Sequence, residues 1–493
     1  MTMTGSGALD GPPAQSRLTE EDAEAHVHGI CFKTGPPHRV GVELEWLVRD
    51  TRDPALRVPA ERIFSAVADL TAPAVLPCPA ALPSGSMLTT EPGGQLELSS
   101  APADSLGECV TAVRREMTTL RETVGRAGLT LQGYGYDPVR PPLRVLDLPR
   151  YAAMEEFFDR TGPWGREMMG NTASVQVCLD AGQETTVKGG YRWRWRLAHH
   201  IGPVLVAAFA NSPLQQGRHS GWRSTRQQVW AHLDPGRTRP PPDDGDPRDA
   251  YATYALDAEL MLIRRDGGPS WVAPRGLTFR GWLRGELGSE RPPTIDDLTY
   301  HLSTLFPPVR PRGHLELRMI DAQCGDGWIV PAAVAWALLE DPCAADTAMA
   351  AAEPLWAHTE DGGAGTTPQS GLFGLFGPFG LPGHERSGND GWPGAATTGA
   401  GNCGHNGHNG HNGHNGHRAG NPTPSGNPWL RAARDGPADP VLARASRQCF
   451  EAADAALGRA GTPAEIRRRV AEFAERYVLR SRCPADDQLE GTQ

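Results

Sequence analysis

Four segments of the chain alternate apolar and polar residues with a period of two, which is the pattern of a β-strand with one buried face. In the first, HRVGVELEWLV (38–48), Glu43 and Glu45 lie on one face and the apolar side chains between them lie on the other. The same alternation recurs in EPGGQLELSS (91–100), NTASVQVCLD (171–180) and GHLELRMID (313–321). We therefore expect four strands, each with one face against the core.

Five longer segments place apolar residues every three to four positions, as helices do. They cover residues 19–30, 103–128, 192–213, 439–461 and 462–480. We expect the second helix to begin at Asp104 or Ser105, and the fifth to begin with a capping box formed by Thr462 and Glu465. The chain is therefore expected to mix strands and helices in its first two thirds and to end in helices.

The segment from about 357 to 430 differs from the rest because it consists mainly of Gly, Pro, Asn and His. Such a composition cannot bury enough apolar surface to offset the entropy of ordering, so we interpret it as a disordered insertion. It separates an N-terminal segment with a short helix (1–37) and a core (38–356) from C-terminal helices (431–493) that we expect to pack on the core. Its five histidines, three residues apart, either bind Ni²⁺, Zn²⁺ or Cu²⁺ weakly or reflect repeat expansion without function.

The polar faces of the four strands are rich in glutamate. Their polar residues are Glu43 and Glu45 in the first segment, Glu91, Gln95 and Glu97 in the second, Thr172, Ser174 and Gln176 in the third, and His314, Glu316 and Arg318 in the fourth. A solvated antiparallel face also alternates in this way, and for any single strand that is the commoner explanation. If all four strands share one sheet, however, the carboxylates converge and repel each other unless cations lie among them.

Carboxylate oxygens suit hard cations such as Mg²⁺ or Mn²⁺ rather than zinc, and Mg²⁺ usually keeps positions open for water and substrate phosphates. With Arg318 beside Glu316 on one face, the predicted site suits transfer of the γ-phosphate of ATP. Only two of the 48 basic residues are lysines, Lys33 and Lys188, and neither lies in a P-loop motif. The sequence therefore predicts a metal-lined sheet in place of a P-loop.

Composition narrows the class of protein further. The chain has 493 residues, 39% of them hydrophobic, and its net charge of −10 argues against a nucleic-acid surface and favours small-molecule partners. No apolar run reaches the roughly 20 residues of a membrane-spanning helix, and the first residues lack the features of a signal peptide, so we expect no membrane partner and a cytoplasmic location. The nine scattered cysteines predict reduced thiols, with Cys178 as a packing residue. His199 and His200 are interpreted as a buried core pair rather than as metal ligands.

Eight motifs, in order, resemble the plant-type glutamate–cysteine ligases, and most closely the bacterial branch that makes γ-glutamylcysteine for ergothioneine in actinobacteria. The motifs are VGVELEWL, EPGGQLELSSAPADSL, MMGNTASVQVCLD, AAFANSPL, GWRSTRQQVWAHLDPGRT, YALDAELMLI, LTFRGWLRGEL and HLSTLFPPVRPRGHLELRMIDAQ. The resemblance covers about 38–343 and resumes after 428. The insertion departs from the family, and the absence of the plant enzymes' transit peptide puts their redox regulation in doubt for this chain.

The resemblance implies an α+β, glutamine synthetase-like fold: a curved, mainly antiparallel sheet with helices packed outside, whose polar face holds two or three Mg²⁺ ions, ATP and glutamate. The implied metal ligands are Glu43, Glu45, Glu91, Glu97 and Glu316. Arg318 then contacts the transferred phosphoryl group, with Glu316 beside it, and Thr172 and Gln176 line the substrate floor. Arg226 and Arg280 are either anchors for the glutamate α-carboxylate or for phosphate, or structural ion pairs.

The implied reaction proceeds in two steps. The γ-carboxylate of L-glutamate attacks ATP to give γ-glutamyl phosphate, and the amine of L-cysteine then displaces phosphate. The sequence identifies neither the base for the amine nor an oligomeric state. Other classes of function remain: a metal-storage protein, a metal-assisted amide hydrolase, or, within the ligases, an enzyme for glutathione synthesis or for another amine acceptor.

Overall fold

The computed structural model describes residues 17–71, 82–242, 245–265, 270–288, 291–357 and 426–491. The predicted insertion at 357–430 lies outside these residues except at its two ends, and so do its five histidines. The expectations about them stay predictions.

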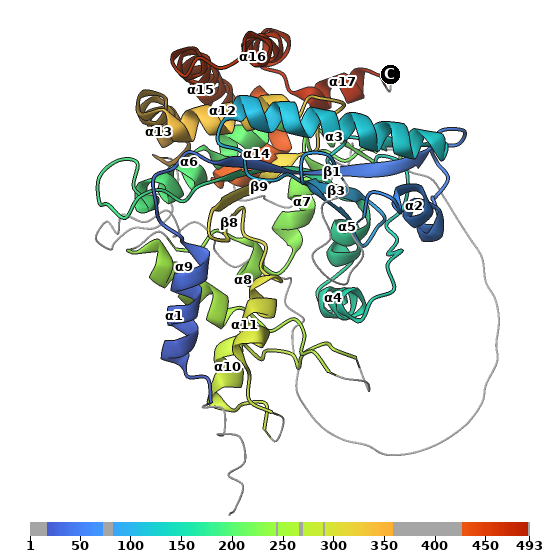
Figure 1. Ribbon diagram of the computed structural model, residues 1–493, viewed down its shortest axis with the longest axis vertical. Coiled ribbons are helices and arrows are strands. Elements are labelled where there is room, and N and C mark those ends of the chain that lie inside the picture. The colour runs from blue at the N-terminus through green and yellow to red at the C-terminus, as the bar shows by residue number, and fades with distance from the viewer. Residues whose placement is uncertain are drawn as a thin grey trace, which may run out of the picture.

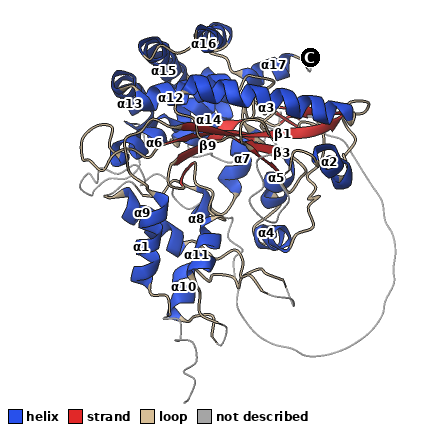
Figure 2. Ribbon diagram, in the orientation of Figure 1, coloured by secondary structure: helices blue, strands red, loops and turns tan. Residues whose placement is uncertain are grey.

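A mainly antiparallel sheet forms the centre of the protein (Figure 2). Its strands run in the spatial order β2-β3-β1-β5-β9-β8, β4 also pairs with β1, and every pairing between them is antiparallel. The strands are β1 (Val40–Asp50), β2 (Met87–Thr90), β3 (Leu96–Ser99), β4 (Leu129–Gln132), β5 (Ser174–Leu179), β8 (Val309–Pro311) and β9 (Leu315–Asp321), and β6 (Leu214–Gln215) and β7 (Arg218–His219) form a separate hairpin. The four predicted strands are thus neighbours in one sheet.

Helices cover the apolar face of the sheet in two layers (Figure 1). The valine and leucine side chains of β1, β3, β5 and β9 pack into this core and are almost completely buried. Directly on the sheet lie α3 (Leu106–Arg126), α6 (Tyr191–Phe209) and α12 (Ile329–Glu340), and outside them lie α13 (Pro342–Trp356), α15 (Pro440–Arg459), α16 (Ala464–Arg476) and α17 (Pro484–Glu490). Helix α14 (Pro428–Asp435) packs against α6 and α7. The expected α+β class, with helices packed outside the sheet, is confirmed.

A second group of helices lies on the side of the polar face (Figure 1). It contains α1 (Glu20–Cys31), α8 (Pro235–Thr238), α9 (Pro247–Asp257), α10 (Phe279–Arg284) and α11 (Ile295–Leu302). Nearer β1 and β3 lie α2 (Ala60–Val67), α4 (Pro149–Asp159) and α5 (Trp164–Asn171), and α7 (Thr225–His232) lies next to β9. The predicted N-terminal helix is α1, which packs on α9. The polar face is therefore enclosed between the sheet and these helices.

The structure shows how two of the predicted helices begin. Ser105 caps α3, since its Oγ accepts the N–H of Glu108 at 3.2 Å, which decides between the two expected caps. The expected Thr462–Glu465 capping box is wrong, because α16 begins after Pro463 and the Glu465 carboxylate accepts from Arg114 Nη1 at 2.8 and 2.9 Å instead.

Two indoles on either side of the gap in the described residues contact the same helix, α6. Trp356, at the end of α13, donates its Nε1–H to the carbonyl of His200 at 3.4 Å. Trp429, in α14, packs over Gly202 so closely that a Cβ there would lie 2.0 Å from the indole, so this contact requires glycine. Because α14 begins at Pro428, the C-terminal helices start earlier than the predicted 431.

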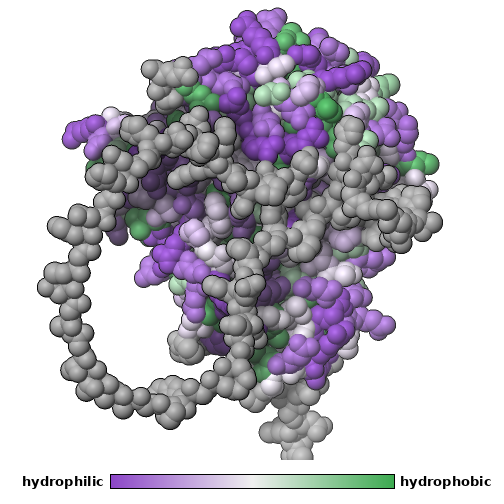
Figure 3. Space-filling view, turned by 180° about the vertical axis from the view of Figure 1, so that it is seen from behind, coloured by the Kyte–Doolittle hydropathy of each residue, from purple (hydrophilic) through white to green (hydrophobic). Residues whose placement is uncertain are grey.

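Other expectations agree with the described part of the chain. His199 and His200 are both buried, and Nδ1 of His199 lies 2.9 Å from the Trp195 carbonyl, which confirms that they form a buried core pair. All seven cysteines among the described residues are free. None of the helices there combines the length and the apolar character needed to cross a bilayer. In the described part of the face shown in Figure 3, hydrophilic residues predominate and hydrophobic ones lie between them in small areas.

Candidate active site

The register of the sheet brings the predicted polar residues onto one surface. Glu45 of β1 pairs with Glu97 of β3, and Glu43 pairs with Gln176 of β5. Glu316 of β9 follows on the far side of β5, opposite Cys178. The alternation along each strand and the antiparallel pairing between strands therefore place these side chains on the same face.

This surface forms the floor of a cavity of about 450 Å³, which we call the active cavity. Helices α4, α5 and α7 supply its walls. Of the predicted site residues, those that line it are Glu43, Glu45, Glu91, Glu97, Thr172, Gln176, Arg226 and Arg318.

Glu316 lies beneath the cavity and is completely buried. Arg310 of β8 holds its carboxylate with both ends of a fork, Nε to Oε2 at 3.0 Å and Nη2 to Oε1 at 2.8 Å, and Arg318 also donates to Oε1. Burial by itself raises the pKa of Glu316, but the charges of Arg310 and Arg318 outweigh it and lower the pKa to about 2. Glu316 was predicted to be a metal ligand. In this structure its carboxylate instead binds and orients the guanidinium groups of Arg310 and Arg318.

Arg318 is joined to the acidic residues through Gln176. Its Nη1 donates to Gln176 Oε1 at 2.5 Å, and Gln176 Nε2 donates to Glu45 Oε1 at 3.1 Å. The other two nitrogens of Arg318, Nε and Nη2, donate no hydrogen bond to any described residue. They form the edge of the guanidinium that can hold two oxygens of one anion.

The four remaining carboxylates, Glu43, Glu45, Glu91 and Glu97, have raised pKa values, so their surroundings favour the protonated form. Burial, together with the charges of Glu316 and Glu97, raises the pKa of Glu43 to about 7. Burial and the charge of Glu45 raise the pKa of Glu97 to about 7, and burial also raises the pKa values of Glu91 and Glu45. A bound cation reverses such shifts, because it stabilises the ionised form.

The donor set fits a hard cation, since it consists of carboxylate oxygens on one face beside a cavity open to water. Among the described residues, however, no three His, Cys, Asp or Glu side chains are gathered around one point as a bound metal would hold them.

Arg226, on α7, is 3% exposed and lines the same cavity. Its Nη2 donates to the backbone carbonyl of Arg318 at 2.8 Å, whereas Nε and Nη1 have no hydrogen-bond partner among the described residues. Asp321, 4.0 Å from Nη1, already accepts from Ser212 and Ser224. Nε and Nη1 are themselves almost inaccessible, so it is the place of Arg226 in the cavity lining, and its positive charge, that suit it to attract an anionic group of a ligand.

Arg280 does not line the active cavity. It lies on α10, where its Nε donates to Asp257 at 2.6 Å and its Nη1 donates to Glu20 at 2.7 Å and to Glu24 at 3.2 Å. Of the two alternatives for this residue, the structure shows the ion pair. Arg280 therefore ties α1 to α10 and is removed from the set of substrate anchors.

Thr172 lines the cavity, but its hydroxyl and its carbonyl both form hydrogen bonds within the protein. Its hydroxyl donates to the Met168 carbonyl at 2.7 Å, and its own carbonyl accepts from Gln95 Nε2 at 2.8 Å.

Burial raises the pKa of the Cys178 thiol well above its usual range, in agreement with a packing role.

Sequence reasoning missed three arginines that line the cavity, Arg150, Arg310 and Arg312. The last two carried a signal: PVRPRGH and LELR form a hairpin around Gly313, whose φ is +79°, and this pairing places Arg310 opposite Glu316. The apolar wall of Met154, Met168, Met169, Trp230 and Phe306 gave no local signal, because these residues come from separate helices and loops.

The chain belongs to the glutamate–cysteine ligase family 2 (GCS2), whose family model matches residues 39–368. Members of this family are ATP-dependent ligases, and a divalent metal ion is typical of them. Within it, the glutamate–cysteine ligase EgtA of Mycobacterium tuberculosis (strain H37Rv) is 40% identical over 365 residues, 72% of this chain and 81% of that protein. EgtA of Mycolicibacterium smegmatis is 41% identical, over 68% of this chain and 77% of that protein.

A more distant relative by sequence agrees with this placement. The chloroplastic glutamate–cysteine ligase of Brassica juncea is 32% identical over 48% of this chain and 46% of that protein. A crystal structure of glutamate–cysteine ligase from Francisella tularensis in complex with AMP aligns with a TM-score of 0.46 and 10% identity, covering 93% of this chain and 86% of that one. The resemblance to the family and to its actinobacterial branch is confirmed.

Proposed function

We propose that the protein joins the γ-carboxylate of L-glutamate to the amine of L-cysteine at the expense of ATP, through γ-glutamyl phosphate. One observation carries this proposal: partly buried carboxylates with raised pKa values line the same cavity as Arg226 and as Arg318, whose Nε and Nη2 donate to no described residue. Cations and anions are both needed to complete such a surface, and Mg²⁺ with a polyphosphate supplies both.

In this proposal the carboxylates bind the metal ions and the arginine binds the phosphoryl group. Glu43, Glu45, Glu91 and Glu97 would hold two or three Mg²⁺ ions, or Mn²⁺, which neutralise the phosphates of ATP when bound. Arg318 presents its Nε–Nη2 edge to the transferred phosphoryl group, and Glu316 and Gln176 fix its orientation.

Arg226 supplies the anchor for a carboxylate of glutamate. Holding glutamate and the γ-phosphate on one rigid sheet provides most of the acceleration, since the attack needs alignment more than it needs a proton transfer. The amine of cysteine then displaces phosphate from the acyl carbon.

The test uses hydroxylamine in place of cysteine. With Mg²⁺, ATP and glutamate the enzyme should form γ-glutamyl hydroxamate, because hydroxylamine traps the acyl phosphate. Cysteine with ATP alone should release no phosphate. ADP formation that requires cysteine but ignores glutamate would exclude the acyl-phosphate route.

The likeness to the EgtA proteins extends the proposal to γ-glutamylcysteine for ergothioneine biosynthesis. A role in glutathione synthesis gives the same product, so the alternative differs only in what consumes it. A ligase for another amine acceptor is distinguished by comparing cysteine with other amino acids at saturating ATP and glutamate.

A further inference from the structure

Asp321, the last residue of β9, is a buried carboxylate that the proposed reaction leaves without a role. Between the residues that pair with Val177 and Val175 of β5, β9 has one residue more than β5, which makes a β-bulge. A bulge reverses which side chains of a strand face each side of the sheet. Asp321 therefore shares the polar face with Glu316, although an odd number of residues separates their places along the strand.

Three hydrogen bonds converge on the Asp321 carboxylate. Oδ2 accepts the backbone N–H of Asn211 at 2.9 Å and the hydroxyl of Ser212 at 2.7 Å, and Oδ1 accepts the hydroxyl of Ser224 at 2.9 Å. An ionised carboxylate only accepts hydrogen bonds, so it draws the protons of both hydroxyls toward itself. The lone pairs of the two hydroxyl oxygens are then free to accept from other groups.

The same two hydroxyls hold the first turn of α7. Ser224 is the N-cap of this helix, and its Oγ accepts the N–H of Gln227 at 3.1 Å. The Oγ of Ser212 accepts the backbone N–H of Arg226 at 3.3 Å. Both N–H groups belong to the set that a helix leaves without intrahelical partners at its start. Asp321 therefore supports the part of the backbone that carries Arg226.

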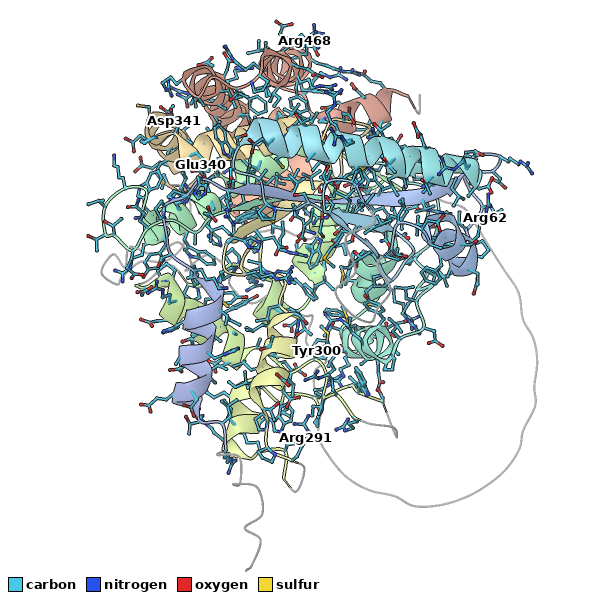
Figure 4. The ribbon with its side chains drawn as sticks, viewed as in Figure 1. Arg62, Arg291, Tyr300, Glu340, Asp341 and Arg468 are labelled. Carbon is cyan, nitrogen blue, oxygen red and sulfur yellow. The ribbon has the colours of Figure 1, made fainter. Side chains whose placement is uncertain are left out.

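The side chains at the start of α7 also reach β9. Nη2 of Arg226 donates to the carbonyl of Arg318 at 2.8 Å, and Nη1 lies 4.0 Å from Oδ1 of Asp321. Gln227 donates from Nε2 to the carbonyl of Met319 at 2.8 Å. In Figure 4 this contact lies just below the sheet, where side chains from the strands and from the helices beneath them meet. The place of the Arg226 guanidinium therefore depends on how the first turn of α7 is held against β9.

We propose that Asp321 is a positioning residue for Arg226: through the hydroxyls of Ser212 and Ser224 it fixes the first turn of α7, and so holds the Arg226 guanidinium in the lining of the active cavity. The inference rests on the proposed function, because it takes Arg226 as the anchor for a carboxylate of glutamate. Asp321 itself does not line that cavity, so it acts on the substrate only through Arg226.

Asp321→Asn provides the first test. The amide keeps the shape of the side chain, but its NH₂ group cannot accept, so one oxygen must serve the donors that two oxygens served before. KM for glutamate should rise roughly tenfold, as expected when a group that holds a substrate is displaced slightly, while KM for ATP and for cysteine should stay within about twofold.

Glu116→Gln is the matched control. Glu116 lies on α3, on the apolar side of the sheet, and is also completely buried. It also accepts three hydrogen bonds, from the N–H groups of Ser84 at 2.8 Å and Ser86 at 3.2 Å and from the Ser86 hydroxyl. Both variants should lower the melting temperature, since each places an NH₂ group among donors. Glu116→Gln should nevertheless leave all three KM values unchanged, because it does not contact α7.

A double-mutant cycle with Arg226→Lys tests whether the effect passes through Arg226. In the Arg226→Lys background, Asp321→Asn should raise KM for glutamate by less than about threefold further, because the group that it positions is already absent. If Asp321→Asn does not fold, Ser224→Ala takes its place in the cycle. This variant removes one donor to Asp321 and the N-cap of α7, and should raise KM for glutamate in the same direction.

Three results would overturn the positioning role. The first is an unchanged KM for glutamate in folded Asp321→Asn while Arg226→Lys raises it, and the second is an equal fold-change in both backgrounds. The third is a joint rise of all three KM values, which would show a general disturbance of the site. Failure of the proposed function is separate, since it would appear as an unchanged KM for glutamate in Arg226→Lys itself, or as hydroxamate formation by the parent enzyme that does not depend on ATP.

Discussion

Replacing Arg318 by lysine tests the central element of the proposed site. Nη1 of Arg318 donates to Gln176 and Glu316, and the Nε–Nη2 edge of the same guanidinium is available to a ligand. A lysine offers one nitrogen, which must either replace the contacts of Nη1 or approach the phosphoryl group. The variant therefore keeps the positive charge but loses the two-point contact with phosphate.

The structure indicates that the fold tolerates this change. Glu316 keeps both hydrogen bonds to Arg310, so no buried carboxylate is left without a partner. The loss should instead appear in the reaction. Removing one pre-oriented donor to developing charge typically lowers kcat by about 10² to 10³, which corresponds to about 2.7–4 kcal/mol. Because the contact strengthens in the transition state, kcat and kcat/KM should fall together.

Steady-state rates with glutamate varied at saturating Mg-ATP and cysteine provide the measurement, with the melting temperature as the check on folding. Arg280→Lys is the matched control, since Arg280 forms ion pairs on α10 outside the cavity and should keep normal rates. If Arg318→Lys stays within threefold of the parent, Arg318 is a structural partner of Glu316 and another arginine contacts the phosphate.

Three further predictions concern the metal, the anchor and the insertion. Mg²⁺ should raise the melting temperature more at pH 8 than at pH 6. In the folded, metal-free protein the pKa values of Glu43 and Glu97 are about 7, against an ordinary value of 4.5, so the stability that these groups contribute is lost as the pH rises through about 7 and a cation restores it. Equal shifts of the melting temperature at both pH values would contradict this. Arg226→Lys should raise KM for glutamate roughly 10- to 100-fold, the value of a hydrogen bond to a charged group, and an unchanged KM would remove Arg226 from the substrate site. Deleting residues 362–424 and joining the ends with a short Gly-Ser linker should leave kcat/KM within a few-fold, because loop length changes stability by only about 0.6 kcal/mol per doubling; loss of activity in a folded variant would show that the segment reaches the active cavity.

The strands with glutamates were predictable because alternation is a local property. A period of two over seven or more residues identifies both β1 and β9 and states which side chains share a face. Short strands such as β2 and β8 lack the length for such a pattern. Their positions depend on hairpin pairing with the neighbouring strands β3 and β9, and their own three or four residues do not record it.

The individual roles within the site were harder to predict than its location. Sequence spacing placed Glu316 on the polar face, but its partner Arg310 comes from a strand of three residues. Arg226 and Arg280 both belong to family motifs, and only their three-dimensional surroundings separate them: one lies in the cavity with unpaired nitrogens, and the other is surrounded by three carboxylates. Such differences are set by packing between helices, which no local pattern records.

The two indoles on α6 have a consequence for the evolution of this chain. Trp356 and Trp429 contact positions His200 and Gly202, which are less than one turn apart, so the two ends of the intervening segment are held near each other by the folded core. A segment whose ends are fixed in this way can lengthen or shorten by slippage of a repeat at little cost to the domain. If the repeat has no function, as one of the two alternatives holds, the position between α13 and α14 is one where the fold would oppose its growth little.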